Sequence, residues 1–395
     1  MKSIEVFFIF LRLGITSFGG PIAHLGYFHQ EFVEKRKWIS PHAYADLVAL
    51  CQFLPGPASS EVGMALGFQR AGYVGSLAAW LGFTLPSASL LVAFAMGMIH
   101  FQDHLQTPLF VGILKGLKIA AVAIVAQAIY VMATKLCLGK LRAALTGVAA
   151  ISVLYFRSSW TSICLLVLGG FIGAAFLSNS ETLPHVSWQK SFSKRQGLFA
   201  LTCFWVIFLV LPLVVHYWPV PAFIQFDSFF RAGSLVFGGG HVVLPMLENE
   251  VVHQGWISSD IFMTGYAAAQ TIPGPLFSFS AYLGALSSFG LHGVAGALLC
   301  VIAIFLPSYL LIIGILPFWE QLRSLSKTQS AMQGMNAVVV GLLIAAFIHP
   351  VWSTAIHQRK DFLLASLSVY FLIFWKKPSW LVVLFCAFSG WLTLP

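Results

Sequence analysis

Two short motifs in this sequence contain the residue types that bind anions through backbone groups. The first is a glycine block, which reads SFGGP at 17–21 and VFGGG at 236–240. The second is a proline–glycine–proline turn, found at 55–57 and again at 273–275. Proline suits the first turn of a helix but not its interior, so each turn predicts two half-helices separated by a break. The free N–H groups that begin the second half-helix would favour a bound anion.

The turns predict half-helices over 42–54 and 57–70, and again over 261–272 and 275–289. Glycine would let backbone amides approach a ligand closely. A proline kink or tight helix packing through glycine is the alternative, but the ordered repetition of both motifs favours a binding site. The candidate substrate-binding residues in the motifs are Gly19, Gly20, Pro55, Gly56, Pro57, Gly238, Gly239, Gly240, His241, Pro273, Gly274 and Pro275.

Charged side chains at matching places add to this candidate site. Arg12 and Arg231 precede the two glycine blocks at the same spacing, and the planar guanidinium group suits an oxyanion. An arginine at membrane depth usually marks a site, although a structural or snorkelling arginine is the alternative. A second set consists of two pairs of polar residues, and the members of each pair share a helix face. For the lysines of this set, contact with lipid headgroups is the alternative role. This candidate anion pathway comprises Lys115 and Lys118, matched by Gln333 and Asn336.

Glu61 and Asp46 are the candidates for proton coupling, because few acidic residues lie in apolar surroundings. Glu61 falls in the first turn after the first proline–glycine–proline motif, where capping of the helix is the alternative role. We expect no enzyme: there is no suggestive serine–histidine–carboxylate set, zinc-protease motif or nucleotide-binding loop. The six cysteines show no metal spacing, so we expect no metal and no cofactor.

The composition places these residues in a membrane. Of 395 residues, 58% are hydrophobic and only 9% are charged, against about 25% charged in a soluble domain. Seven apolar runs approach the roughly 20 residues that cross a bilayer as a helix: 73–99, 109–134, 160–178, 197–215, 291–316, 328–348 and 378–394. The net charge of +9 lies mostly in short connectors, which indicates cytoplasmic anchoring and not nucleic-acid binding.

Ordered matches between the two parts of the chain predict a tandem duplication. Besides the motifs above, WIS recurs at 38–40 and 256–258, and LPS at 85–87 and 306–308. The predicted units are a first repeat over 1–178, a linker with an extra span over 179–218, and a second repeat over 219–395. The connector after the first glycine block is basic and its counterpart is acidic, which favours opposite sides of the membrane. We expect an all-α polytopic membrane protein with two inverted repeats and broken or re-entrant helices.

At these motifs the sequence resembles the bacterial chromate ion transporter family in its long, two-domain form. The stretches that carry the resemblance are LRLGITSFGGPIAHLGYF (11–28), FVEKRKWIS (32–40), YADLVALCQFLPGPASS (44–60), RAGSLVFGGGHVVLPMLENE (231–250) and GYAAAQTIPGPLFSFSAYLG (265–284). The resemblance implies secondary active export of chromate, a tetrahedral oxyanion, across the bacterial inner membrane, with resistance to chromate. Exchange with protons is the coupling it implies.

Three alternatives stay open at this stage: a carrier of sulfate or another oxyanion, an anion channel, and a membrane enzyme that acts on lipid or chromate. Reduction of chromate would need an electron carrier, and no flavin, haem or cluster motif is present in the sequence. The expected partners are a chromate- or sulfate-like oxyanion, the lipid bilayer and a second copy of the chain as a homodimer, without nucleic acid.

Overall fold

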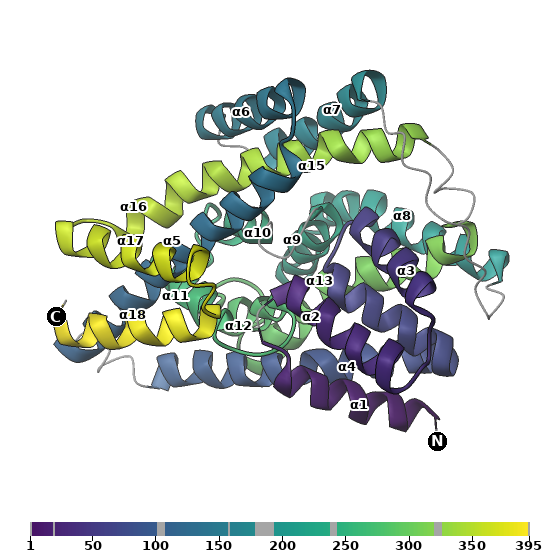
Figure 1. The fold of residues 1–395 in the computed structure, drawn as a ribbon, viewed down its shortest axis with the longest axis horizontal. Helices are drawn as coiled ribbons and strands as arrows, with labels where there is room; N and C mark the ends of the chain where they lie inside the picture. The colour runs from purple at the N-terminus through teal and green to yellow at the C-terminus, as the bar shows by residue number, and fades with distance from the viewer. Residues whose placement is uncertain are drawn as a thin grey trace.

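In the computed structural model every element of the described residues is a helix (Figure 1), which confirms the predicted all-α class. The structure describes residues 2–18, 20–100, 107–156, 159–177, 193–237, 243–319 and 326–393. The first part of the chain forms α1 (Lys2–Thr16), α2 (Gly20–Phe28), the π-helical turn η1 (His29–Lys35), α3 (Pro41–Phe53), α4 (Ala58–His100), α5 (Pro108–Leu136), α6 (Lys140–Tyr155) and α7 (Ser159–Phe176).

A single long helix, α8 (Lys194–Tyr217), stands between the two parts. The second part forms α9 (Pro221–Leu235), α10 (Val243–Val251), α11 (Ser259–Ala269), η4 (Leu276–Ser278), α12 (Phe279–Leu286), α13 (Gly293–Ile315), η5 (Leu316–Phe318), α15 (Ser326–Ala346), the π-helical turn η6 (Phe347–Trp352), α16 (Ser353–Ala355), α17 (Arg359–Ile373) and α18 (Ser379–Thr393).

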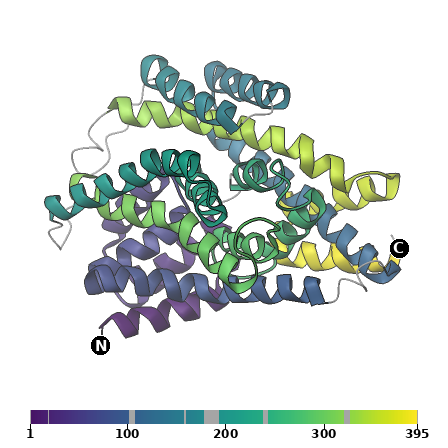
Figure 2. The same ribbon diagram turned by 180° about the vertical axis from the view of Figure 1, so that it is seen from behind.

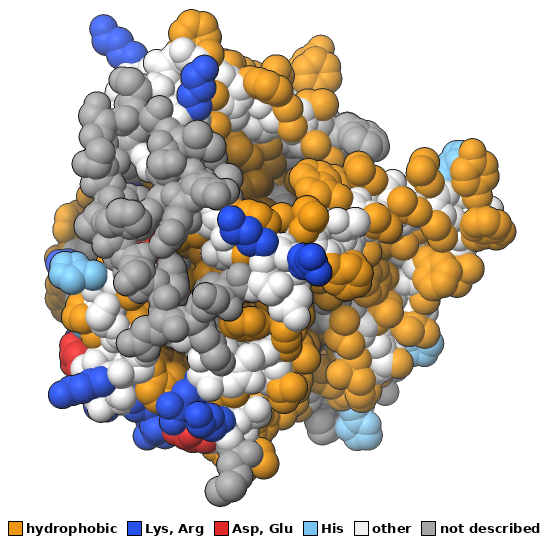
Figure 3. Space-filling view, turned by 90° about the vertical axis from the view of Figure 1, so that its right-hand side faces the viewer, with side chains coloured by type: hydrophobic (Ala, Val, Ile, Leu, Met, Phe, Trp, Pro, Cys, Tyr) orange, Lys and Arg blue, Asp and Glu red, His pale blue; other side chains and the backbone are white. Residues whose placement is uncertain are grey.

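Several helices are long and apolar enough to cross a membrane. Among the described residues these are Ala58–His100, Phe110–Leu136, Lys194–Tyr217, Gly293–Phe318 and Gln329–Ala355. Two further predicted runs, 160–178 and 378–394, coincide with shorter apolar helices. In the view onto the end that carries the N-terminus, apolar side chains cover much of the surface (Figure 3). A surface of this kind is stable in lipid and not in water, so the prediction of a multi-pass membrane protein is confirmed.

Both predicted backbone breaks are present. α3 ends just before the first proline–glycine–proline turn and α4 begins directly after it, whereas α11 ends shortly before the second turn and η4 follows it. Gly56 and Gly274 have φ values of +137° and +109°, a backbone conformation that favours glycine. α4 is itself bent at Ala71 and Gly72, so its first arm matches the predicted half-helix over 57–70.

Glycine allows matching helix pairs to pack closely in the two parts of the chain. A side chain at Gly14 of α1 would collide with the backbone of Phe83 in α4. About 220 residues later, a side chain at Gly233 of α9 would collide with the backbone of Ile304 in α13. Small residues at such crossings let membrane helices approach each other. The α1–α4 and α9–α13 pairs are therefore equivalent frameworks.

The last helices of each part pack against the other part. α6 and α7 pack on α15, and α17 and α18 pack on α5, an exchange visible at the top and left of Figure 1 and again from behind in Figure 2. Glycine again permits the contacts, because Gly334 of α15 lies against the backbone of Gly169, and Gly116 of α5 against that of Cys386. This exchange interlocks the two parts of the chain.

Candidate functional site

The two broken segments meet in the fold. The proline–glycine–proline turn of each part hydrogen-bonds to the glycine block of the other part. The Gly56 N–H donates to the carbonyl oxygen of Val236 at 2.7 Å, the first residue of the second glycine block. The Gly274 N–H donates to the carbonyl oxygen of Ser17 at 3.1 Å, in the first glycine block. Each turn is thus held by the opposite part of the chain. These two amides are already hydrogen-bonded, so an anion at either turn would have to use other donors.

The recurring LPS motifs explain why both turns need glycine. Ser308, in the second motif, comes so close to Gly56 that a side chain there would collide with its hydroxyl. Ser87, in the first motif, lies beside Gly274, and its hydroxyl is 2.7 Å from that of Ser278 at the start of the following helix. Each serine therefore packs against the turn of the opposite part. The sequence shows the repeated motif but not this exchange of partners.

His24 connects the first glycine block, at Ser17, with the helix that follows the first turn, at Ser59. Its Nε2 lies 3.2 Å from the Ser17 carbonyl oxygen and its Nδ1 lies 3.3 Å from the hydroxyl of Ser59 in the first turn of α4. A carbonyl oxygen only accepts, so the hydrogen-bond network assigns the proton to Nε2 and makes Ser59 the donor to Nδ1. The same carbonyl accepts from Gly274. The neutral imidazole thus fixes the geometry of the crossing.

Glu61 is the only predicted coupling residue without a protein hydrogen bond of ordinary geometry in the described part of the chain. Its side chain is fully buried, and neither carboxylate oxygen meets such a partner. The Ser308 hydroxyl is the polar group that faces it, from the opposite part of the chain. Asp46, the other candidate, accepts a hydrogen bond from the indole N–H of Trp319 at 3.2 Å. Glu61 is therefore the stronger candidate for a proton-binding group.

A cavity of about 370 Å³ opens beside the first turn. At the roughly 30 Å³ that each water takes up in the liquid it has room for about a dozen waters, enough for a hydrated oxyanion. Its polar lining side chains are Gln52 of α3, Lys135 of α5 and Asn336 of α15. The remaining lining is Pro21, Leu25, Cys51, Leu54, Gly56, Ala58, Val131, Met132 and Leu136. The cavity therefore brings the predicted residues Gly56 and Asn336 together with two donors, Gln52 and Lys135, that were not predicted.

Arg12 is already neutralised by carboxylate partners. Its guanidinium lies 2.6 Å from the carboxylate of Glu31, although 57% of the Arg12 side chain is exposed. Glu31 also accepts a hydrogen bond of 2.7 Å from Arg36. Burial alone would raise the pKa of the Glu31 carboxyl, but the Arg36 hydrogen bond and the nearby positive charges lower it below its ordinary value. The buried carboxylate is therefore ionised and ties α1 to the connector.

Arg231 is held in the same way within its own helix. Its Nε donates to both oxygens of Asp227 at 2.9 Å, and both side chains are largely buried. A further nitrogen donates to the carbonyl oxygen of Phe208 in α8. Neither predicted arginine lines the large cavity. Their contacts fit a structural role better than direct contact with a substrate.

The predicted lysine pathway is also largely occupied by protein partners. Lys115 pairs with Asp361 at 2.9 Å and Lys118 pairs with Asp260 at 2.6 Å. Gln333 accepts a hydrogen bond from Arg142 at 2.5 Å. Asn336 is the member of this set that faces the cavity. The acidic partners lie more than 100 residues away in sequence and carry no local signal, so sequence reasoning could not identify them.

Five predicted residues lie outside the described residues: Gly19, Gly238, Gly239, Gly240 and His241. Of the other motif residues, Gly20 begins α2 with a φ of +76°, next to the cavity residue Pro21. Pro55 and Pro57 flank Gly56 beside the cavity. Pro273 and Pro275 flank Gly274 at the second turn, which is not part of the cavity lining.

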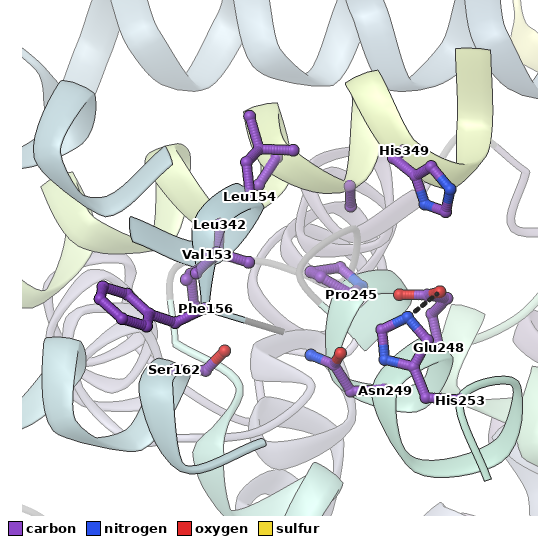
Figure 4. A pocket seen from close by; sticks show the side chains of 12 residues that line it. Val153, Leu154, Phe156, Ser162, Pro245, Glu248, Asn249, His253, Leu342 and His349 are labelled. Carbon is purple, nitrogen blue, oxygen red and sulfur yellow. Dashed lines mark ion pairs between the residues drawn. The ribbon is translucent and has the colours of Figure 1, made fainter. Parts of the chain in front are cut away.

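A second, smaller pocket lies between α10 and α15 (Figure 4). Its volume is about 40 Å³, room for about one water. The imidazole of His253 lies 3.2 Å from the carboxylate of Glu248, and His349 projects into the same space from η6. The size and the carboxylate of Glu248 both disfavour an oxyanion there. The cavity beside the first turn is therefore the better candidate site.

Comparison with known proteins bears on what the cavity holds. A family profile described as chromate transporter matches residues 4–174 and 223–391. The chromate transport protein of Pseudomonas aeruginosa is 28% identical over 420 residues, which span 100% of this chain and 93% of that protein. The chromate transport protein of Cupriavidus metallidurans is 28% identical over 94% of this chain and 88% of its own length. A probable chromate transport protein of Synechococcus elongatus is 28% identical over 96% and 93%, respectively. No solved structure matches the chain.

Proposed function

The chain belongs to the chromate transporter family, and on this premise we propose that it exports chromate from the cytoplasm in exchange for protons. Membership of this family confirms that the chain is a transporter and not an enzyme. The observation that carries the proposal is the cavity of about 370 Å³ lined by amide and ammonium donors. Export across the bacterial inner membrane would lower cytoplasmic chromate and confer resistance.

The proposed framework is a pair of inverted repeats over 1–178 and 219–395, joined by the linker 179–218. Reciprocal contacts support it, because a two-fold axis makes residue i contact j while the counterpart of j contacts the counterpart of i. The Gly56–Val236 and Gly274–Ser17 hydrogen bonds have this form. The charges favour inversion, since Lys35, Arg36 and Lys37 lie in one connector and the acidic connector of α10 takes the equivalent place.

The proposed binding residues are those that line the cavity with donors. Lys135 would neutralise part of the charge of a dianion, and the side-chain amides of Gln52 and Asn336 would donate hydrogen bonds to its oxygens. Ala58 adds the N-terminal end of α4 to the lining, where the helix dipole favours negative charge. In this proposal Gly20 and both proline–glycine–proline turns shape the break, Arg12 holds the first connector, and Arg231 holds α9 against α8.

Glu61 is the proposed proton-binding residue. A buried carboxyl group without a cationic partner is costly in a membrane protein and usually has a function. Gly56 lines the cavity on one side and touches the Glu61 carboxylate on the other. An anion in the cavity and a negative charge on Glu61 would therefore repel each other across one residue. Binding of the anion and protonation of Glu61 would therefore be coupled, and the vesicle experiment below decides whether the proton moves against the anion or with it.

Inside-out membrane vesicles test the proposal directly. Their outer surface is the cytoplasmic face, so export appears as uptake of chromate into the vesicle. We expect a pH gradient, acidic inside, to drive accumulation above the external concentration and an uncoupler to abolish it. Accumulation that ignores the proton gradient would refute the coupling. Absence of accumulation, with equilibration only, would favour the anion channel that the sequence left open.

A carrier for sulfate or a related oxyanion is the second candidate. The cavity donors, an ammonium group and two amides, recognise charge and oxygen atoms and contain nothing selective for chromium. Competition in the same vesicles separates the two candidates. Sulfate that inhibits chromate uptake and is itself accumulated would identify a general oxyanion carrier, whereas sulfate without effect would identify a chromate-selective one.

A further inference from the structure

We infer that α3 and α11 are alternating gates, and that the cavity beside the first turn is the loading site for the oxyanion on the cytoplasmic face. In this structure the α3 side is open. The equivalent side, beside the second turn, is closed by α11 through the ion pair between Lys118 and Asp260. The inference rests on the proposed transport function and adds to it the position and the sidedness of the site.

The packing of the two equivalent helices carries the inference. α11 packs against α5 and α4 of the first part of the chain. The equivalent neighbours of α3 would be α15 and α13, but within the described residues α3 makes at most marginal contact with either. The space between α3 and α15 is the cavity, lined by Gln52 from one helix and Asn336 from the other. α11 is thus packed against α5, whereas α3 is held to the second part of the chain by the Asp46–Trp319 hydrogen bond and leaves the space toward α15 open.

Within the described part of the chain, the ion pair that closes α11 has no equivalent at α3. Lys118 and Asp260 are 2.6 Å apart, and the positions that correspond to them are Asn336 and His42. No hydrogen bond joins Asn336 to His42 among the described residues. Gln52, at the end of α3, is exposed.

At the second turn the residue equivalent to Gln52 is Gln270, which is half-buried. Its carbonyl oxygen accepts a hydrogen bond of 3.5 Å from Ser379, at the start of α18. The second turn is therefore covered at the position where the first turn is accessible.

The basic residues indicate which face the open side meets. Lys135 lines the cavity and is exposed. It also begins the basic connector 135–142, which the positive-inside rule places in the cytoplasm. Lys115 and Lys118, by contrast, are paired with Asp361 and Asp260. Of these three lysines, Lys135 is therefore the one that offers an approaching anion a positive charge without a carboxylate partner in the described part of the chain, and it does so at the mouth of the cavity.

The ion pair between Lys118 and Asp260, which we call the latch, is weak enough to break during transport. Asp260 is 67% exposed in its pair with Lys118, and partly exposed ion pairs contribute little to stability. Such a contact can break once in each transport cycle. Alternating access in transporters with inverted repeats moves one element of a symmetric pair while its counterpart makes the opposite movement. Docking of α3 onto α15 with release of α11 from α5 would expose the same site to the other face.

The test is the accessibility of single cysteines in the full chain from which the six native cysteines have been removed. Gln52→Cys reports on the open side and Gln270→Cys on the closed side. A membrane-impermeant maleimide is applied to inside-out and right-side-out vesicles, and the cysteine-free chain is the control for background. We expect Gln52→Cys to be labelled only from the cytoplasmic face, and Gln270→Cys to be labelled slowly from either face.

Removal of the latch sharpens the test. We expect Asp260→Asn to raise labelling of Gln270→Cys from the periplasmic face and to lower labelling of Gln52→Cys. The charge exchange Lys118→Asp with Asp260→Lys should restore the original pattern. Glu34→Gln, which removes the exposed His29–Glu34 pair, is the matched control and should change neither rate. Labelling of Gln52→Cys from the periplasmic face, or labelling that ignores Asp260→Asn, would overturn the inference.

Protection by oxyanions separates this inference from the proposed function. Chromate or sulfate, but not chloride, should slow labelling of Leu136→Cys in the cavity wall. If the labelling pattern and its response to Asp260→Asn hold but neither oxyanion protects, the gates stand and the proposed substrate fails. If chromate accumulates in vesicles while Gln52→Cys and Gln270→Cys are labelled alike from both faces, transport stands and the gates fail.

Discussion

The segments that follow the two proline–glycine–proline turns differ in charge at the fourth residue after the turn. After the first turn comes Glu61, buried and facing Ser308. After the second comes Phe279, whose ring packs against those of Phe262 and Tyr282. The shared backbone places a side chain at the centre of the molecule in both parts. The two parts of the chain therefore bury a side chain at the same place in the motif, but the first part presents a titratable group and the second an apolar ring.

The connectors differ in the same manner. The pair His29–Glu34 in η1 and the pair Glu248–His253 at the end of α10 occupy equivalent positions at the same 3.2 Å separation, but acid and base have changed places. The first connector adds Arg36 to the pair of Arg12 and Glu31, whereas the second is acidic. Equivalent geometry with opposite charge is what two connectors on opposite sides of a membrane would need.

We expect the largest effect on transport from substitution of Glu61, the acid whose equivalent position holds a phenylalanine. Glu61→Gln keeps the shape of the side chain but cannot release a proton, so we expect loss of proton-driven chromate accumulation in vesicles. Phe279→Leu, at the equivalent position, should keep most of the transport. Equal loss in both variants would mean that packing at the centre, and not titration, is what transport requires.

The glycines of the turns should rank next. Gly56→Ala would place a methyl group against Ser308 and Glu61 in a backbone conformation that disfavours alanine, at a cost of about 4 kcal/mol. Gly274→Ala meets only the side chain of Ser87 and the Phe83 carbonyl, so we expect about 2 kcal/mol. Thermal unfolding in detergent measures both. Gly147→Ala, in open space on α6, is the control and should be neutral or stabilising.

Substitution of the buried Arg231 should cost more stability than substitution of the exposed Arg12. Arg231→Ala leaves the largely buried carboxylate of Asp227 without its partner, and we expect a loss of about 3 kcal/mol. Arg12→Ala removes an exposed side chain, and Glu31 keeps Arg36, so the loss should be about 1 kcal/mol or less. Chromate resistance should fall more for Arg231→Ala. Equal and complete loss of transport in two stably inserted variants would return both arginines to the binding site.

The smallest effects concern the repeated WIS motifs. Ser40 accepts a hydrogen bond from the N–H of Ala43 at 3.2 Å, and Ser258 accepts one from that of Ile261 at 3.3 Å. Each serine is therefore the N-cap of a gate helix, α3 or α11. Ser40→Ala and Ser258→Ala should each cost about 1 kcal/mol, again measured by thermal unfolding. A much larger effect of Ser258→Ala alone would indicate that docking of α11 depends on its first turn.

Local chemistry accounts for most of what the sequence predicts correctly. The breaks at Gly56 and Gly274 follow from the flanking prolines, which act on their own backbone and need no tertiary information. The long apolar runs identify the membrane helices for the same reason. The pairing of Lys118 with Asp260 joins segments 142 residues apart, and no local pattern announces it. The cavity was not predicted because its lining comes from α2, α3, α5 and α15, which are spread along the sequence. In the sequence alone, Lys135 is indistinguishable from a lysine that anchors a helix at the membrane surface.

The exchange of terminal helices has a consequence for how the chain is made. α5 emerges early, but the helices that cover its glycine face, α17 and α18, are synthesised more than 200 residues later. Until then the Gly116 surface lies against lipid or an incorrect neighbour. Assembly around α5 must therefore wait until α18 has been synthesised. Damage to the C-terminal hairpin, far in sequence from the first turn, should be detected by cellular quality control as a failure of the first half of the protein.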